Sequence, residues 1–422
     1  MKPNPSNAVV GEPSPQQAKA ASLHVLTLTP FFPSLENEVG GCFVKEPLDA
    51  LAGYGITSSV IAVSPIYNER QHSNATALAE WVRYPQIPGT IGLSSAGRFL
   101  HARLHRRVEQ LHGERPIDVI HAHAALPCGH AASLLVRRLK IPYIVTVHGL
   151  DVFNTCFLTG APAEWRRRAS IAVYRDASVI ACVSRKVQKI LEDGMPDGAR
   201  AGVRVNVRSA VVYNGTDTEL FSPTLDDRRP TLTEAPAPPP EILVVGNLIP
   251  SKGQELVLRA IHRLANEFPS AQCRIIGDGP DRARLEALAG ELGVRARIHF
   301  LGRQNRLAVA DALRRCTLFA LPSRNEGLGC VYLEAMACAK PVIGCRGQGI
   351  EEIIEHQENG WLISPDNLDE LTQALSTFLR SPSLCSQIGF AARQTILNGL
   401  TLAHQAQELA TLYRLAASNR AL

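Results

Sequence analysis

The sequence PSRNEGLGCVYLEAMACAKPVIG occupies residues 322–344. It follows the apolar run TLFAL, and its pattern predicts a loop, a helix from about Leu328 and a second apolar run, PVIGC. A short strand, a helix and another short strand in this order are typical of a parallel sheet with helices on both faces. The segment therefore predicts the fold class α/β.

Two glutamates in this segment, Glu326 and Glu334, lie eight positions apart. If both were helical, their backbones would be about 12 Å apart along the axis. That distance is too long for an acid/base pair acting on one glycosidic bond. It suits two residues that bind two parts of one elongated ligand. Gly327 and Gly329 permit close backbone approach, and the free amides of the next turn can bind an anion. We interpret the segment as a diphosphate site; an amphipathic helix with solvated glutamates is the alternative.

The alternation of strands and helices extends outward from this segment. The C-terminal half contains the runs EILVVGN, AQCRIIG and RIHFLG, and the N-terminal half contains LHVLTLT, TSSVIAVS, IDVIHAHA, IPYIVTVHG, ASVIACVS and SAVVYNG. Between the halves, PTLDDRRPTLTEAPAPPP is rich in proline, which favours an extended linker. We predict a disordered tail at 1–21, an N-terminal domain at 22–222, a linker at 223–240, a C-terminal domain at 241–395 and a final helix at 396–422.

The composition excludes several classes of protein. A chain of 422 residues predicts two or three domains, and 45% hydrophobic with 20% charged residues is typical of globular proteins. A net charge of +5 is far below that of a dedicated nucleic-acid binder. The ten cysteines show no C-x-x-C pair, which indicates reduced core thiols in a cytoplasmic protein. We also expect neither a signal peptide nor a membrane span.

A second segment, VVGNLIPSKG, places Gly246 at a strand end and Lys252 at the opening of a helix. A lysine there can neutralise a leaving phosphate as a compact charge, although a surface lysine in a turn is an equal alternative. The spacing is not that of a P-loop, which argues against nucleoside triphosphate hydrolysis. A third segment, IIGDGP, places Gly277 and Gly279 after a strand. These glycines are candidates for the ligand site, and an ordinary tight turn is the alternative interpretation.

In the N-terminal half, several polar residues and glycines follow predicted strands, at the edge where an open parallel sheet binds ligands. They are Gly40, Gly41, His148 and Asp151. His121 and His123 alternate on another strand, so one of them is expected to face the same crevice. For each histidine the alternative is a buried core residue whose ring nitrogens form hydrogen bonds within the protein. His148, which precedes a glycine, is the better candidate for a ligand contact.

Residues 98–115, RFLHARLHRRVEQLHGER, hold five arginines and two glutamates, with apolar residues at near-helical spacing. A basic amphipathic helix can lie against anionic lipid. The alternative is a surface helix that packs on the first domain and keeps its arginines solvated.

Taken together, these segments resemble the nucleotide-sugar-dependent glycosyltransferases of family 4, which are retaining enzymes with the GT-B fold. The resemblance covers about residues 23–375 in the order of the family. The matching segments are FFPSLENEVGGCFVKEPLDAL, DVIHAHAALPCG, TVHGLD, VVYNGTDTELFSP, VGNLIPSKG, IIGDGP, FLG at 300–302 and PSRNEGLGCVYLEAMACAKPVI.

The resemblance implies two facing Rossmann-like domains, with the acceptor bound by the first, the nucleotide-sugar by the second, and the last helix crossing back to the first. By analogy, Glu326 contacts hydroxyls of the transferred sugar, Glu334 accepts from the ribose hydroxyls, and Lys252 holds the diphosphate. His148 would face the sugar near the acceptor. The other implied donor-binding residues are Asn247, Gly277, Gly279, Gly327, Leu328 and Gly329, and the implied acceptor-side residues are Gly40, Gly41, His123 and Asp151.

One position departs from the family. Its members often carry an arginine directly after the glycine of the strand-end motif, where this chain has Asn247. The diphosphate site therefore lacks one expected cation. Either Lys252 acts with the backbone amides alone, or Arg324 or Arg303 compensates.

The resemblance implies a retaining transferase that moves a sugar from a nucleoside diphosphate sugar, with UDP as the commonest nucleotide, to a glycan or lipid-linked acceptor of a surface polysaccharide or glycolipid. No carboxylate is an obvious covalent nucleophile. Retention of the configuration at the anomeric carbon therefore suits a front-face displacement, in which the acceptor attacks from the side of the leaving diphosphate. No Asp-x-Asp motif occurs, so we expect metal-independent turnover. We expect no cofactor and a cytoplasmic location, with peripheral contact to the inner face of the membrane if the helix at 98–115 binds lipid. The alternatives are a sugar-nucleotide epimerase of the same architecture and an inactive glycan-binding relative, although the NEGLG to LEAMA segment and the EVGGCF loop favour a transferase.

Overall fold

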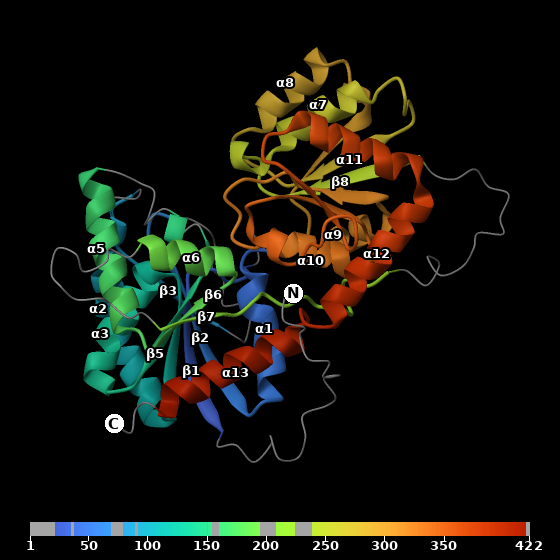
Figure 1. Ribbon diagram of the computed structural model, residues 1–422. Coiled ribbons are helices and arrows are strands. Elements are labelled where there is room, and N and C mark those ends of the chain that lie inside the picture. Colours follow the sequence, from blue (N-terminus) through green and yellow to red (C-terminus); the bar gives the residue numbers. More distant parts are fainter. Residues whose placement is uncertain are drawn as a thin grey trace.

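The computed structural model describes residues 22–34, 38–68, 79–88, 92–149, 151–153, 160–194, 208–223 and 239–418. The predicted tail at 1–21 and most of the predicted linker, residues 224–238, lie outside the described residues. The described chain forms two parallel sheets, each covered by helices on both faces (Figure 1). The predicted α/β class is therefore confirmed.

The N-terminal domain is built on a seven-stranded parallel sheet of order β3-β2-β1-β4-β5-β6-β7. Its strands read as apolar runs because both faces are covered, and β4 and β5 are buried at every position. Helices α2, α3 and α5 pack together on one face. The strands are β1 (Leu23–Thr29), β2 (Ile56–Pro65), β3 (Glu80–Tyr84), β4 (Val119–His123), β5 (Tyr143–Val147), β6 (Val179–Cys182) and β7 (Ser209–Val211). The helices are α1 (Cys42–Ala52), α2 (Leu93–Glu114), η2 (Ala125–Gly129), α3 (His130–Leu139), α5 (Ala161–Asp176) and α6 (Arg185–Gly194).

The C-terminal domain is built on a six-stranded parallel sheet of order β10-β9-β8-β11-β12-β13. Helices α7, α8 and α11 cover one face, and α9, α10 and α12 lie on the other (Figure 1). The strands are β8 (Glu241–Val245), β9 (Gln272–Ile276), β10 (Ile298–Gly302), β11 (Leu318–Ala320), β12 (Val342–Cys345) and β13 (Trp361–Ile363). The helices are η5 (Pro250–Lys252), α7 (Gln254–Arg263), α8 (Arg282–Glu291), η6 (Arg295–Arg297), α9 (Arg306–Arg315), α10 (Cys330–Ala337), η7 (Gly349–Glu352), α11 (Leu368–Arg380) and α12 (Pro382–Leu397).

The last helix, α13 (Leu402–Ser418), packs against α1 and the first sheet rather than against the sheet that precedes it in sequence (Figure 1). The chain crosses between the domains where Thr401 pairs with Thr216. A Cβ at Gly215 would come within 2.4 Å of the Thr401 carbonyl oxygen, so only glycine allows this crossing. The hydroxyl of Tyr413 then reaches His121 in β4, at 2.8 Å.

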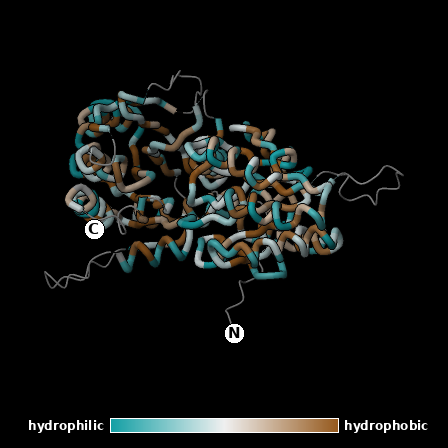
Figure 2. Tube along the Cα trace, turned by 90° about the horizontal axis from the view of Figure 1, so that it is seen from above, coloured by the Kyte–Doolittle hydropathy of each residue, from teal (hydrophilic) through white to brown (hydrophobic). Residues whose placement is uncertain are grey.

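Helix α2 covers the region predicted as a basic amphipathic helix. Leu100, Leu104 and Val108 are fully buried in the core of the N-terminal domain, so its apolar stripe is not available to lipid. Arg103 and Arg106 face the solvent. The apolar stripe of the helix thus packs on the first domain, as the alternative interpretation expects, while its arginines lie on the outer face. Figure 2 shows hydrophilic and hydrophobic residues interleaved along the helical coils of the molecule.

Two further sequence features can be placed on the structure. The nine described cysteines are free thiols, and all but Cys330 are buried. Among the helices in the described ranges, none is both long and apolar enough to span a bilayer.

Candidate active site

A cavity of about 490 Å³ lies between the two domains, a volume typical of small-molecule sites. The N-terminal domain contributes the turn before α1, and the C-terminal domain contributes the loops after β8 and β9 and the first turns of α9 and α10. Five of the implied donor-binding and acceptor-side residues line this cavity together. They are Gly40, Gly41, Asn247, Gly277 and Glu334.

The loop before α10 carries the sequence NEGLG. Asn325 and Gly329 both have positive φ, 58° and 85°, so helix α10 cannot begin at Leu328 as predicted and begins at Cys330. Glu326 therefore lies in the loop, and the spacing estimate that treated both glutamates as helical was wrong in its premise. The two carboxylates have different partners, Lys252 for Glu326 and Arg306 for Glu334.

Gly327 lies where loops of the two domains pack together. A Cβ at this position would lie 2.4 Å from the carbonyl oxygen of His148 in the other domain. The carbonyl of Gly327 also accepts a hydrogen bond from the Ser184 hydroxyl, at 2.7 Å. The predicted glycine is thus required because two loops from different domains meet there.

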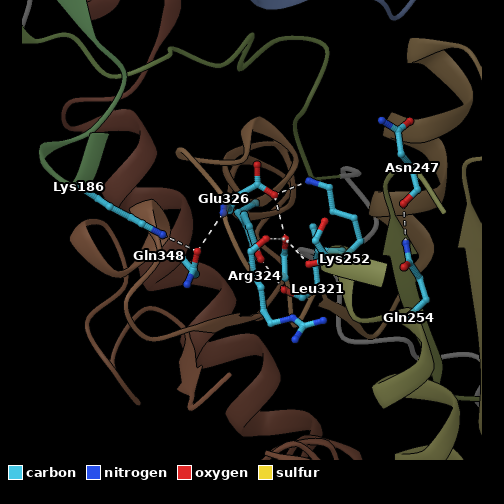
Figure 3. Close-up of polar contacts among 11 residues, drawn as sticks. Lys186, Asn247, Lys252, Gln254, Leu321, Arg324, Glu326 and Gln348 are labelled. Carbon is cyan, nitrogen blue, oxygen red and sulfur yellow. Dashed lines mark hydrogen bonds and ion pairs between the residues drawn. The ribbon is translucent and has the colours of Figure 1, made fainter. Parts of the chain in front are cut away.

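Lys252 and Glu326 form an ion pair beside the cavity (Figure 3). Both side chains are largely buried, with 21% and 15% of their surface exposed. The Ser323 hydroxyl donates to the same carboxylate oxygen of Glu326, at 3.1 Å. A left-handed Gly253, whose Cβ would lie 2.3 Å from a carbonyl oxygen, ends the turn that carries the lysine. The pair does not line the cavity itself, but a Cβ at the lining residue Gly246 would lie 3.8 Å from the Lys252 side chain.

Glu334 has a partner that the sequence does not reveal. The guanidinium of Arg306, the first residue of α9, donates to Glu334 and also to Glu46 of α1 in the N-terminal domain. The same guanidinium lies over the ring of Phe221, 4.6 Å from its centroid. Burial raises the pKa of Glu46, and the charge of Arg306 opposes that shift. One arginine in the cavity lining therefore holds a carboxylate from each domain.

The histidines form a buried cluster. His148 Nε2 lies 3.0 Å from His123 Nδ1, and the ring of His148 packs against Phe43 with centroids 4.7 Å apart. His121 lies deeper and contacts Thr146 at 2.7 Å as well as α13. Burial lowers the pKa of His148 and of His121 to about 3, so both imidazoles are neutral near pH 7. Of the two histidines in β4, His123 is the one beside His148.

Asp151 is directed at the backbone of its own loop. Its Oδ1 accepts from the amides of His148, Gly149 and Val152, at 3.0 to 3.1 Å. Burial raises the pKa of Asp151 to about 6, and these amide bonds oppose the shift. The carboxylate thus fixes the turn that carries His148, which lines a separate small pocket with His123 and does not line the interdomain cavity.

The two arginines considered as substitutes for the missing cation differ in position. Arg303 lines the cavity. Arg324 pairs with Asp366 at 3.0 Å, and its guanidinium points away from the Glu326 carboxylate (Figure 3). The backbone carbonyl oxygen of Asn247 accepts a hydrogen bond from the Gln254 side chain, at 3.0 Å. This contact does not use the side chain of Asn247, which is one of the residues that line the cavity.

Gly277 and Gly279 are required by close packing of two loops. A Cβ at Gly277 would come within 2.0 Å of the Gly246 carbonyl oxygen, and one at Gly279 within 2.4 Å of the Leu248 carbonyl oxygen. Gly279 does not line the cavity.

The fold and this cleft define a class of protein, in which two parallel α/β domains enclose a ligand site between them. Residues 43–220 match the family described as Glycosyltransferase Family 4, and residues 230–395 match the family described as Glycosyl transferases group 1. The chain therefore belongs to the glycosyltransferases of the family 4 type with the GT-B fold, and it is an enzyme of that class.

Known relatives agree with this assignment. Alpha-D-kanosaminyltransferase of Streptomyces kanamyceticus is 26% identical over 391 residues, covering 88% of this chain and 98% of the relative. The GDP-mannose-dependent alpha-(1-6)-phosphatidylinositol monomannoside mannosyltransferase of Mycolicibacterium smegmatis is 28% identical over 300 residues, covering 69% of this chain and 75% of the relative. The structure of Anabaena HepE in complex with UDP and glucose has a TM-score of 0.69 and 21% identity, covering 92% of this chain and 99% of that one, which shows the fold alone.

Proposed function

We propose that this glycosyltransferase moves a sugar from a nucleoside diphosphate sugar to a glycan or lipid-linked acceptor, in the synthesis of a surface polysaccharide or glycolipid. The observation that carries the proposal is the interdomain cavity, which has Glu334 in its lining and the Lys252–Glu326 pair beside it. An elongated ligand lying between those groups would have its ribose at Glu334, its diphosphate at Lys252 and its sugar at Glu326.

Binding of the donor would exchange partners within the site. Lys252 would leave Glu326 and pair with the diphosphate, and the freed carboxylate would accept hydrogen bonds from sugar hydroxyls. The N-terminus of α10 has no side-chain cap, so its amides remain for phosphate oxygens. Arg303 in the cavity lining supplies a further positive charge, in place of the family's arginine at position 247.

The chemistry would follow from this placement. The bond between the anomeric carbon and the diphosphate breaks while the acceptor oxygen bonds to that carbon from the same face, and the acceptor proton passes to the departing phosphate oxygen. Lys252 and the α10 amides stabilise the negative charge that develops on the diphosphate. Retention of configuration is proposed from the resemblance to retaining enzymes.

A product assay tests the proposed function. The chain is incubated with UDP-glucose or GDP-mannose and a panel of glycan and lipid-linked acceptors, and the products are analysed by mass spectrometry and NMR. We expect release of the nucleoside diphosphate together with a new α-linked glycan. A change of sugar in the nucleotide without any acceptor would indicate an epimerase instead. Absence of both transfer and donor hydrolysis would indicate a glycan-binding relative.

Turnover is expected to be independent of divalent metal, because Lys252 and helix amides would offset the charge of the leaving diphosphate. The transfer rate with excess EDTA should lie within about twofold of the untreated rate, since no step would use a metal. Loss of activity in EDTA that manganese restores would contradict this expectation.

We also propose that the outer face of α2 binds anionic lipid at the cytoplasmic face of a membrane. Arg98, Arg103 and Arg106 are exposed, and Phe99 is 44% exposed beside them. Each arginine near an anionic surface contributes about 1 kcal/mol to binding. We expect salt-sensitive sedimentation with phosphatidylglycerol vesicles, a weaker one for the double variant Arg103→Glu, Arg106→Glu, and none with phosphatidylcholine vesicles. Equal binding by the variant would remove α2 from the membrane contact.

A further inference from the structure

A lysine of the N-terminal domain reaches the loop region that carries Glu326. Lys186 is the second residue of α6, and its ammonium donates to the side-chain oxygen of Gln348, at 2.6 Å (Figure 3). It also lies 5.3 Å from the ring centroid of Phe153. No sequence motif singled out this residue.

Gln348 connects this lysine to Glu326. The same side-chain oxygen accepts a hydrogen bond from the backbone amide of Glu326, at 2.9 Å, and Gln348 is only 8% exposed. Figure 3 shows Lys186, Gln348, Glu326 and Lys252 in a row, so that Glu326 lies between a lysine from each domain. The charge on Lys186 strengthens the bond to the Gln348 oxygen and orients it toward the Glu326 amide.

The start of α6 is itself fixed against the C-terminal domain. The Glu352 carboxylate accepts from the backbone amides of Arg185 and Lys186, at 2.8 and 2.7 Å, and from the Tyr213 hydroxyl at 2.8 Å. Burial lowers the pKa of Lys186, and the charges of Glu326 and Glu352 oppose that shift. The position of Lys186 therefore depends on the two domains meeting as they do here.

We propose that Lys186 and Gln348 are positioning residues for the transferred sugar, holding Glu326 where it contacts the sugar hydroxyls once the domains are closed. The proposal rests on the proposed function. The nucleotide end of the cavity is lined by Asn247, Gly277 and Glu334, and neither Lys186 nor Gln348 lines it. In the proposed binding mode Glu326 contacts the sugar, and Gln348 accepts from the Glu326 amide, so we expect the pair to act on recognition of the sugar and not of the nucleotide.

The test compares two ligands on the full chain. Affinities for UDP-glucose and UDP, and for GDP-mannose and GDP, are measured by calorimetry for the wild type and for Lys186→Met. We expect about a tenfold loss of affinity for the sugar nucleotide, the size of one charge-assisted hydrogen bond, and less than a twofold change for the matching diphosphate. A structural defect would weaken both ligands alike, and that result would overturn the proposal.

Three further variants sharpen the test. Lys189→Met removes an exposed lysine of the same helix and should leave both affinities unchanged. Gln348→Leu should reproduce the loss, and combining it with Lys186→Met should add nothing, because both act through one contact. Lys186→Arg should recover part of the affinity. Additive losses, or wild-type sugar-nucleotide affinity in Lys186→Met, would overturn the role of Lys186 and leave the proposed function standing. A wild type that binds none of the four ligands would contradict the proposed function as well.

Discussion

Lys252→Ala is expected to lower the rate of sugar transfer by about 100-fold or more, because the variant loses the ammonium that would stabilise the departing diphosphate. In the unliganded protein the same change leaves the Glu326 carboxylate largely buried and without its cation. The measurement is kcat and KM for the donor at saturating acceptor. We expect most of the loss in kcat, since charge on the diphosphate develops during bond breaking.

The matched control for this prediction is Lys189→Ala, which removes an exposed positive charge in the middle of α6 in the other domain. It should transfer sugar at the wild-type rate. Lys252→Arg should retain part of the activity because it keeps the charge. Wild-type transfer by Lys252→Ala would remove the lysine from the reaction.

Gly327→Ala is expected to have an effect of similar size by a steric route. The added Cβ would lie 2.4 Å from the His148 carbonyl oxygen, closer than packed atoms allow, and at a tight 3.3 Å from Gly149 Cα. The loop that carries Glu326 must then move away from the N-terminal domain. A displacement of about 1 Å at reacting groups can cost about 100-fold in rate. We expect that loss in kcat, with a melting temperature close to that of the wild type.

Gly290→Ala provides the control, because Gly290 lies in α8 and a Cβ there has no neighbour within 4 Å. This variant should keep full activity and gain slightly in stability. Full activity in Gly327→Ala would mean that the contact between the domains is not needed for catalysis.

The sequence predicted much of the fold because parallel α/β architecture leaves a periodic signal. Each buried strand, such as β4 or β5, is a short apolar run, and loops with glycine or polar residues mark its carboxyl end. That edge is where Gly41, Asn247 and Gly277 come together around the cavity. The start of α10 was misplaced because a left-handed Gly329 looks the same in sequence as a helical one.

The contacts between the domains had no such signal. Arg306 joins Glu334 to Glu46, which is 260 positions away in the chain, and Lys186 meets Gln348 at a separation of 162. Local patterns report periodicity and turn chemistry, and they carry no information about which charged side chains meet across a cleft. Glycines such as Gly277 were interpreted as ligand contacts, whereas the packing of neighbouring loops already requires them.

The central claim is that the donor diphosphate binds in the cleft between Lys252 and the start of α10. A crystal structure of the chain with UDP tests it most directly, with GDP as the second ligand if UDP does not bind. The account predicts phosphate oxygens within hydrogen-bond distance of the Lys252 ammonium and of the first amides of α10, with the ribose at Glu334. A nucleotide bound outside the interdomain cavity, with Lys252 still paired to Glu326, would contradict it.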